Sequence, residues 1–377
     1  MEITYLDNAA TTPLDPRVRD AMLTTLEVDF GNPSSRHPLG VRAREALEGA
    51  RVRVAQATGA EPEGVVFTAG GTEANNLALF GTPRGPGHAL IGPTEHSSVR
   101  QPAQVLAEAG WEIEALRLDA SGNLDLEHLV AALRPDTRLV TCMLVNNEFG
   151  TVYPIARVAK LVRANAPQAW LHVDAVQGLG KVPVSIGELG CHSLSVSAHK
   201  IHGPKGSGAL VLAKGSAPKP RLFGGGQENG VRSGTENVAG CVGLGVAASS
   251  AAEHVALHGD DRSLRELLRE ELSRVPGARL LDPGSERSPV ICAVLLPGPQ
   301  AEVWMHHLEA RGVYSSVGAA CQARRGGVPP ALKALGLDDE EARRVLRISF
   351  SRLTTREDVL RAVAELERAE RELGVIG

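Results

Sequence analysis

Short apolar runs alternate with longer segments of helical pattern along the first two thirds of the chain. The apolar runs have the length of strands; they cover residues 64–68, 89–91, 139–145, 170–173, 193–197 and 208–212. The helical patterns between them cover residues 73–80, 99–109, 124–133 and 155–164. This alternation predicts an α/β fold with a mostly parallel sheet and helices on both faces. In such sheets, ligands gather at the carboxyl ends of the strands.

The last third of the chain predicts a second, smaller α/β unit. A charged helical stretch over residues 247–274 connects the two units, and strands over 289–296 and 347–350 follow with helices over 301–310 and 356–372. We therefore expect a large domain over residues 14–255 and a small domain made of residues 1–13 and 256–377. The glycine-rich polar segment 222–240 is predicted to be a functional loop.

Composition narrows the classes of protein. The chain has 377 residues, 43% of them apolar and 22% charged, which is typical of a soluble globular protein. A net charge of −4 argues against nucleic-acid binding, and no apolar run approaches the length that crosses a bilayer. The N-terminus lacks the pattern of a signal peptide. Five scattered cysteines favour reduced thiols and a cytoplasmic location.

One lysine stands out by its context. Seven lysines accompany 33 arginines, and Lys200 follows a Ser-x-His sequence and precedes a Gly-Pro turn. A lysine amine can lose its proton and attack a carbonyl group, whereas the guanidinium of arginine cannot. Taken alone, the motif equally describes a surface lysine beside a glycine turn.

Two further motifs give this lysine a partner. The strand over 64–68 runs into Gly70, Gly71 and Thr72, a glycine turn at a helix N-terminus, where backbone amides and the helix dipole favour a phosphate. The alternative is an ordinary turn with a threonine cap. Asp174 ends the strand over 170–173, where a carboxylate can hold a pyridine nitrogen protonated. The ordered set of phosphate cup, strand-end acid and lysine predicts a pyridoxal phosphate site.

The chain resembles the cysteine desulfurases of iron–sulfur cluster assembly, which are class-V aminotransferase-like pyridoxal phosphate enzymes of fold type I. The resemblance spans nearly the whole chain. It rests on residues 6–13, 31–35, 69–76, 94–96, 146–150, 174–177, 197–206, 224–228, 232–237, the Cys321 loop and 347–350.

The resemblance implies a role for each matching residue. Lys200 would hold pyridoxal phosphate covalently, Asp174 would pair with its ring nitrogen, and Gln177 with its ring hydroxyl oxygen. The phosphate would be bound by Gly71, Thr72, Ser197 and His199, and by Thr235 across a dimer interface. His96 would stack on the ring and transfer protons; Asn146 would bind the cofactor and, with Arg347, the substrate carboxylate. Considered singly, His96 also suits a turn, Asn146 a helix cap and Arg347 a salt bridge.

Five cysteines compete for the role of nucleophile. Cys142 and Cys292 lie in apolar strand segments, Cys241 lies in a small-residue helix, and Cys191 is ambiguous. Cys321 differs because it lies in a small, polar loop with two arginines shortly downstream, which lower a thiol pKa. The resemblance implies that Cys321 takes sulfur from L-cysteine as a persulfide, releases L-alanine, and passes the sulfur to an acceptor such as an iron–sulfur scaffold protein.

Other functions stay open from the sequence. Selenocysteine lyase is a sister activity that uses the same lysine and cofactor, and residues 139–144 and 316–321 suit it equally well. The loop after Cys321 reads Gln-Ala-Arg-Arg-Gly-Gly where many desulfurases are rich in serine, which leaves the sulfur acceptor undetermined. A zinc hydrolase would use the pairs at 172 and 174, 191 and 192, and 199 and 202, but their spacing matches no standard zinc pattern. An inactive scaffold protein is the remaining alternative.

Overall fold

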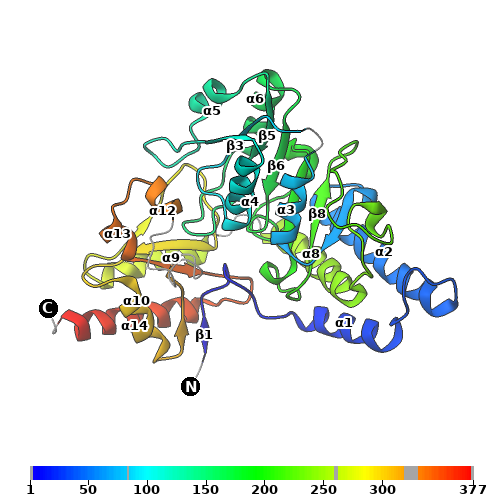
Figure 1. Cartoon of the computed structure of the whole chain (residues 1–377). Coiled ribbons are helices and arrows are strands. Elements are labelled where there is room, and N and C mark those ends of the chain that lie inside the picture. Colours follow the sequence, from blue (N-terminus) through cyan, green and yellow to red (C-terminus); the bar gives the residue numbers. More distant parts are fainter. Residues whose placement is uncertain (1–2, 83–84, 259–261, 318–329, 375–377) are drawn as a thin grey trace.

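A seven-stranded sheet forms the centre of the molecule (Figure 1). The computed structural model describes residues 3–82, 85–258, 262–317 and 330–374. The strand order is β2-β8-β7-β6-β5-β3-β4, and β8 runs antiparallel to both of its neighbours while the other pairs are parallel. The strands are β2 (Val65–Thr68), β3 (His88–Ile91), β4 (Glu112–Ala115), β5 (Thr137–Thr141), β6 (Trp170–Asp174), β7 (Ser193–Ser197) and β8 (Gly208–Leu212). The mostly parallel α/β sheet predicted from the sequence is confirmed.

Alternation along the strands gives the sheet two buried faces. In β8, Ala209 and Val211 belong to one core cluster, and Leu210 belongs to the other. Helices α3 (Gly71–Phe80) and α4 (Ser97–Glu108) contribute to the cluster around Leu210. The opposite cluster receives α2 (Pro38–Thr58), α6 (Ile155–Asn165) and α8 (Val238–His258). Successive side chains of a strand point to opposite faces, so both faces are covered by helices.

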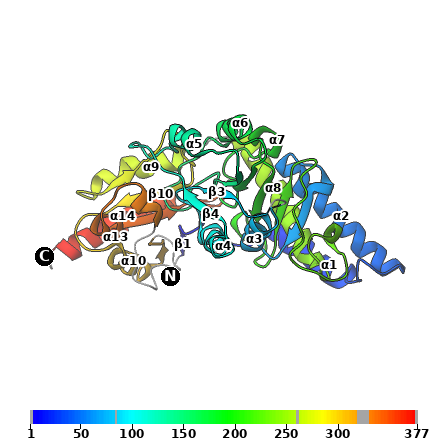
Figure 2. The same cartoon turned by 45° about the horizontal axis from the view of Figure 1, so that its top comes forward.

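Smaller helices and turns complete this part of the chain. They are α1 (Pro16–Val28), α5 (Leu126–Ala132), α7 (Ile186–Leu189) and the short 3-10 turn η2 (Ala198–Lys200) that follows β7. Helix α1 packs along α8, and Figure 2 shows α1, α2 and α8 together at one end of the molecule.

The C-terminal third builds a second, antiparallel sheet. Its order is β12-β10-β9, and Ala293 of β10 is paired with Arg347 of β12. The strands are β9 (Arg279–Leu281), β10 (Ile291–Leu295) and β12 (Val345–Ser349); the helices are α9 (Ser263–Glu271), α10 (Ala301–Glu309), α12 (Pro330–Ala334), α13 (Asp339–Arg343) and α14 (Arg356–Gly374). Trp304 of α10 and Val363 of α14 lie in its core. Beside it, β1 (Thr4–Tyr5) pairs with β11 (Val313–Tyr314).

The N-terminal segment joins the two sheets. Figure 1 shows it leaving β1 beside the small unit and crossing to α1 on the other side of the molecule. Leu6 packs in the core of the C-terminal sheet, and Ala9 packs in a core of the large sheet. We propose that the two sets of cores mark two domains, residues 14–255 and residues 1–13 with 256–377.

Some element boundaries differ from those expected, and so does the character of one helix. The apolar run 139–145 is strand only as far as Thr141, because the chain then turns and Val145 forms an isolated bridge with Val152. Helix α8 begins at Val238 and so includes the end of the predicted loop. Residues 238–257 of this helix are long and apolar enough to span a membrane by composition, contrary to expectation, but 61% of that window is buried inside the protein, as in a core helix.

Candidate active site

Lys200 ends the η2 turn directly after β7, where the N-terminal segment crosses the sheet edge. Its Nζ donates to the carbonyl oxygens of Ala9 at 2.7 Å and Ala10 at 2.8 Å. Burial and the positive charge of Arg347 lower the pKa of Lys200 to about 8. The amine therefore loses its proton far more readily than that of an exposed lysine, which suits attack on a carbonyl group.

Asp174 is the last residue of β6, the strand beside β7. Because β6 and β7 are parallel, the carboxylate and the η2 turn lie at the same edge of the sheet. Asp174 Oδ1 accepts a hydrogen bond from the Val176 amide at 3.0 Å, and Oδ2 accepts one from Asn75 Nδ2 at 2.8 Å. Two fixed donors therefore orient the carboxylate.

The predicted phosphate cup lies at the N-terminus of α3. Gly70 has φ 151° and ψ −179°, a backbone conformation that residues other than glycine rarely adopt. A Cβ on Gly71 would lie 2.6 Å from Val176 Cγ2, so only glycine lets α3 approach the loop after β6. Thr72 follows in the first helical turn and is exposed, and Ser197 is buried at the end of β7. These features leave an open helix N-terminus beside the strand ends.

Two histidines border this region. His96 caps α4, and its Nδ1 accepts from the Ser98 amide at 3.1 Å and bonds the Ser98 hydroxyl at 2.8 Å. Although the His96 residue stays accessible, desolvation of its ring lowers its pKa. His199 Nδ1 lies 3.1 Å from Thr11 Oγ1, and burial lowers the pKa of His199 to about 4. Both rings are therefore neutral near pH 7.

Gln177 and Asn146 approach the site from neighbouring loops. Gln177 Nε2 donates to Ala9 O at 2.8 Å, whereas its Oε1 is buried without a hydrogen-bond partner among the described residues. Asn146 is fully buried, and its Oδ1 accepts from the amides of Glu148 and Phe149 at 2.8 and 2.9 Å. The Asn146 carboxamide thus caps the turn over residues 147–149, which is not the helix cap that the sequence left open.

Arg347 reaches the site from β12 of the small unit. Its Nη2 binds Asp7 Oδ1 at 2.8 Å, and its Nη1 donates to Asn147 O at 3.0 Å. The side chain is 4% exposed. The N-terminal segment, the loop after β5 and the small sheet therefore meet at this guanidinium.

Among the described residues, Thr235 makes no hydrogen bond to another predicted site residue, although Arg232 of the same segment pairs with Glu73 beside Thr72. Thr235 lies in an exposed stretch before α8, and Gly234 beside it has φ 118°. Within one chain, the structure brings together the other predicted site residues that it describes. Cys321 lies outside the described residues.

The residues at the sheet edge fit pyridoxal phosphate. The cofactor presents an aldehyde, a pyridine nitrogen, a ring hydroxyl and a phosphate. The Lys200 amine, whose pKa is lowered, matches the aldehyde, and the oriented Asp174 carboxylate matches the ring nitrogen. The Gln177 amide, whose buried oxygen lacks a partner among the described residues, matches the ring hydroxyl. The helix N-terminus at Gly71 matches the phosphate.

The sequence reasoning missed several buried polar residues around the site. Asn75 and His172 are fully buried and form a hydrogen-bonded line to Asp174. Burial and the charge of Asp174 raise the pKa of Glu95 to about 8, so Glu95 is neutral at pH 7. The sequence did offer a signal for each residue: Asn75 is a polar residue inside an apolar helix, and His172 comes two residues before the acid that ends its strand.

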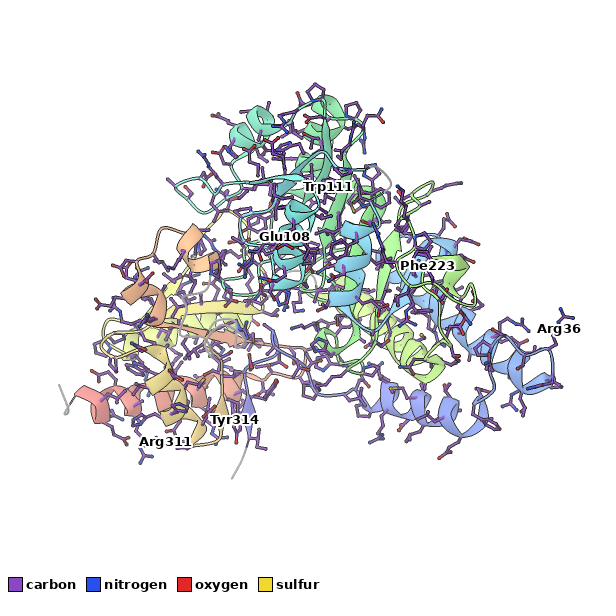
Figure 3. All side chains as sticks on the ribbon, in the orientation of Figure 1. Arg36, Glu108, Trp111, Phe223, Arg311 and Tyr314 are labelled. Atoms are coloured by element: carbon purple, nitrogen blue, oxygen red, sulfur yellow. The ribbon has the colours of Figure 1, made fainter. Side chains whose placement is uncertain are left out.

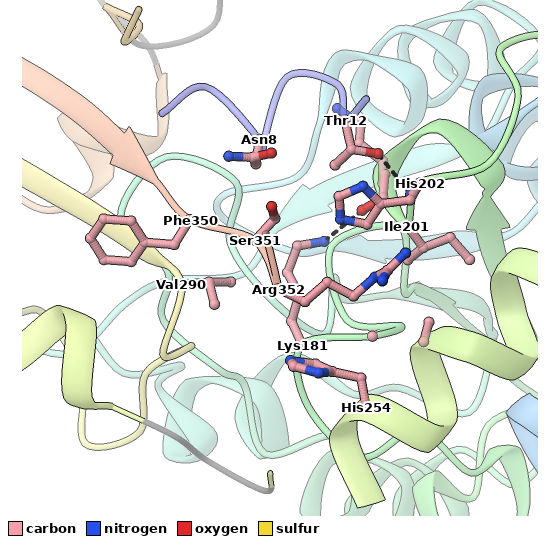
Figure 4. A pocket seen from close by; sticks show the side chains of 13 residues that line it. Asn8, Thr12, Lys181, Ile201, His202, His254, Val290, Phe350, Ser351 and Arg352 are labelled. Carbon is pink, nitrogen blue, oxygen red and sulfur yellow. Dashed lines mark hydrogen bonds between the residues drawn. The ribbon is translucent and has the colours of Figure 1, made fainter. Parts of the chain in front are cut away.

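A pocket beside Lys200 lies between the two units (Figure 4). Lys181, His202 and Arg352 line it together with the Lys200 turn. Lys181 Nζ donates to Lys200 O at 3.4 Å, and burial lowers the pKa of Lys181 to about 7. Besides burial, the charge of Lys181 contributes to the lowered pKa values of His199 and His202 beside the η2 turn.

The four described cysteines are all buried and unpaired. Burial raises the pKa of Cys191 to about 12 and of Cys292 to about 11, and it also raises the pKa of Cys142 and Cys241. A buried thiol of raised pKa is a poor nucleophile. None of these four suits attack on a substrate sulfur.

The side chains named for a zinc site do not assemble. His172 hydrogen-bonds Asn75 and Ser193, and His202 Nδ1 hydrogen-bonds Pro13 O at 2.9 Å. Within the described ranges, no group of three or more histidine, cysteine, aspartate or glutamate side chains is placed to hold a metal ion.

The low pKa of Lys200 leads to a prediction about cofactor loading. We expect the rate at which pyridoxal phosphate attaches to the cofactor-free protein to rise with pH and to level off above about pH 8, because only the neutral amine attacks. Below that pH the rate should fall roughly tenfold for each pH unit. Growth of visible absorbance after mixing measures it. A rate that keeps rising to the ordinary lysine pKa of about 10.4 would contradict the prediction.

The chain is similar to known proteins over most of its length. A family model described as aminotransferase class-V matches residues 4–361. Cysteine desulfurase IscS of Dictyoglomus turgidum is 39% identical, with 99% of this chain and 95% of that protein covered. Selenocysteine lyase of Bos taurus is 36% identical, with 97% and 92% covered.

Solved structures show the same architecture. A NifS-like protein superposes with a TM-score of 0.90 at 33% identity, with 100% of both chains covered. SspA in complex with cysteine superposes with a TM-score of 0.80 at 31% identity, covering 93% of this chain and 100% of the other. With a family match over most of its length and relatives that align nearly from end to end, the chain belongs to the class-V aminotransferase family.

Proposed function

We propose that this protein is a pyridoxal phosphate-dependent cysteine desulfurase, which converts L-cysteine to L-alanine and keeps the sulfur as a persulfide on Cys321. Members of the family depend on pyridoxal phosphate. The observation that carries the proposal is the buried Lys200 amine of lowered pKa at the same sheet edge as the oriented Asp174 carboxylate. The similarity to an IscS desulfurase and to the cysteine complex of SspA supports cysteine as the substrate.

Each residue would perform a definite part of the chemistry. When bound, pyridoxal phosphate supplies an aldehyde for the substrate amine and a ring that accepts the electron pair left at Cα. Asp174 would pair with the ring nitrogen, and Gln177 with the ring hydroxyl. Lys200 Nζ, once free, would take the Cα proton, and His96 would share the proton transfers on the opposite side.

The Cys321 thiolate would then attack the substrate sulfur. A sulfur–sulfur bond forms as the bond between sulfur and Cβ breaks, and the electron pair of the broken bond stays with the substrate. Protonation of that carbon, together with return of a proton to Cα, gives alanine. The burial of the four described cysteines supports Cys321, which lies outside the described residues, as the nucleophile.

Arg347 and Asn146 would select the substrate by its carboxylate. The buried Arg347 guanidinium leaves its Nε without a hydrogen-bond partner among the described residues, so N–H groups beyond those bonded to Asp7 and Asn147 remain for an amino-acid carboxylate. Asn147 O and Asp7 hold the guanidinium in place, so little side-chain entropy is lost when the substrate binds.

We propose a homodimer in which Thr235 completes the partner's phosphate site. Large apolar side chains are exposed on α1, just after its end, and on the segment before α8; they include Leu26, Phe30 and Phe223, of which Phe223 is 84% exposed and labelled in Figure 3. Exposed aromatic and aliphatic side chains of this kind support an interface. Thr235 lies in the same exposed segment as Phe223.

The sulfur would pass from Cys321 to an acceptor protein such as an iron–sulfur scaffold, in the cytoplasm. The name of the IscS relatives supports an acceptor of this type. Unpaired thiols at all four described cysteines support a reducing compartment.

Alanine release from the two candidate substrates tests the function. We expect the purified enzyme to release alanine from L-cysteine, and to retain sulfur on the protein before any acceptor or reductant is added. Parallel assays with L-selenocysteine provide the comparison, because relatives that are 36% identical are selenocysteine lyases. Alanine release from selenocysteine with none from cysteine would replace the desulfurase with the lyase.

A further inference from the structure

A line of buried polar side chains lies between the central sheet and helices α3 and α4 and meets at Asn75. Asn75 Nδ2 lies 2.8 Å from Asp174 Oδ2 and 2.8 Å from Ser98 Oγ, and Asn75 Oδ1 lies 3.0 Å from His172 Nε2. The carboxamide therefore uses both of its N–H groups and its oxygen. Asn75 and His172 are each 0% exposed, so water cannot substitute for these partners.

The chemistry of the partners fixes the direction of each hydrogen bond. Asp174 is an acceptor, so the Asn75 amide nitrogen must face it and the Asn75 oxygen must face His172. Burial lowers the pKa of His172 to about 3, so its ring is neutral and carries its one hydrogen on Nε2. His172 Nδ1 then accepts from the Ser193 hydroxyl at 2.9 Å, which itself accepts from Trp170 Nε1 at 2.9 Å.

The second branch runs from Asn75 to His96. The other N–H of Asn75 donates a hydrogen bond to Ser98 Oγ. The Ser98 hydroxyl hydrogen is then directed to His96 Nδ1, 2.8 Å away, which also accepts the Ser98 amide at 3.1 Å. His96 Nδ1 is thereby reserved as an acceptor, and the ring proton lies on Nε2.

We propose that Asn75 is a positioning residue that aligns the Asp174 carboxylate and the His96 ring together, and that His172 sets its orientation. One carboxamide thus controls the two groups expected to contact the cofactor ring at its nitrogen and on its face. Without the hydrogen bond from His172, the Asn75 carboxamide is free to rotate. In the rotated form its oxygen faces the Asp174 carboxylate, and the two oxygens repel each other. This inference rests on the cofactor part of the proposed function.

Cofactor affinity provides the first test. Asn75→Leu replaces the carboxamide with an apolar side chain of similar volume. We expect it to raise the dissociation constant of pyridoxal phosphate about tenfold. This is the lower end of the affinity loss that follows removal of a group that orients the binding residues. The visible absorption band of the loaded protein should also shift. His172→Phe should change both quantities in the same direction.

Asn76→Leu is the matched control. Asn76 lies on the same helix, is less buried, and its amide donates to Thr72 O at 2.8 Å within that helix. We expect its cofactor affinity and absorption band to match those of the wild type. Thermal unfolding of each variant identifies any that fail to fold; if Asn75→Leu fails, His172→Phe is judged by the same two readouts.

Nitrogen NMR shifts of histidine-labelled, cofactor-free protein provide the second test. We expect His172 to be protonated at Nε2 alone and to stay neutral as the pH is lowered to about 4, because its pKa is about 3. His96 should carry its proton on Nε2 when neutral. A His172 ring protonated at Nδ1 would overturn the inference, as would cofactor affinities within about twofold of wild type for both folded variants. If the wild type binds no pyridoxal phosphate, the proposed function fails, and the NMR result still judges the network.

Discussion

Replacing Lys200 with alanine is expected to lower alanine release from L-cysteine by about 10³-fold or more, the scale for losing a positioned acid–base group. The amine at this position would both hold the cofactor and take the Cα proton, so one substitution removes two functions. Its two carbonyl partners, Ala9 and Ala10, belong to the N-terminal segment. The measurement is alanine release together with the visible spectrum before and after borohydride treatment.

Two further variants separate chemistry from charge. Lys200→Arg keeps a positive charge near the same carbonyls but cannot lose its proton, so we expect it to be as inactive as the alanine variant. Lys205→Ala removes an exposed lysine just downstream and should retain wild-type activity. An active Lys200→Arg enzyme would show that the position needs only a cation and would refute the proposed role.

Replacing Cys321 with serine is expected to abolish the protein-bound persulfide and to reduce cysteine desulfuration by about 10³-fold, since a serine hydroxyl is not ionised at pH 7 and does not attack sulfur. The cofactor spectrum should stay intact, because none of the residues matched to the cofactor changes. Mass spectrometry after incubation with L-cysteine measures the added sulfur atom directly.

The buried cysteines provide matched controls for this variant. Cys191→Ser and Cys241→Ser should each keep the persulfide and the activity, because burial raises both thiol pKa values and removes these cysteines from solvent. Sulfur located on either residue in the wild-type protein would contradict the assignment to Cys321.

Elements of the large sheet were predicted well where local pattern and structure coincide. The strands Ser193–Ser197 and Gly208–Leu212 have the expected bounds because each is a short run with apolar residues at alternate or successive positions that is bounded by polar or glycine-containing segments. Helices α1 and α2 were not predicted. The buried face of α2 contains Gly40, Ala43, Ala50 and Ala57 besides a few larger side chains, so the apolar periodicity there is weak.

The sequence by itself determined the chemical groups and the order in which they follow their strands. Gly71, Asp174 and Lys200 each come within three residues of the end of a predicted strand, and a parallel sheet brings the ends of such strands to one edge. The residue type and its position at the end of a strand were sufficient to predict these three site residues, because both can be read from a few neighbouring residues in the sequence.

Only the tertiary structure decided how these groups are tuned. The low pKa of Lys200 depends on burial and on Arg347, which comes from the other unit of the chain. The orientation of Asp174 depends on Asn75 and, through it, on His172, about 100 residues away in the sequence from Asn75. Desolvation and hydrogen-bond direction are properties of a packed interior, where distant segments exclude water from one another, so no local pattern of residues encodes them.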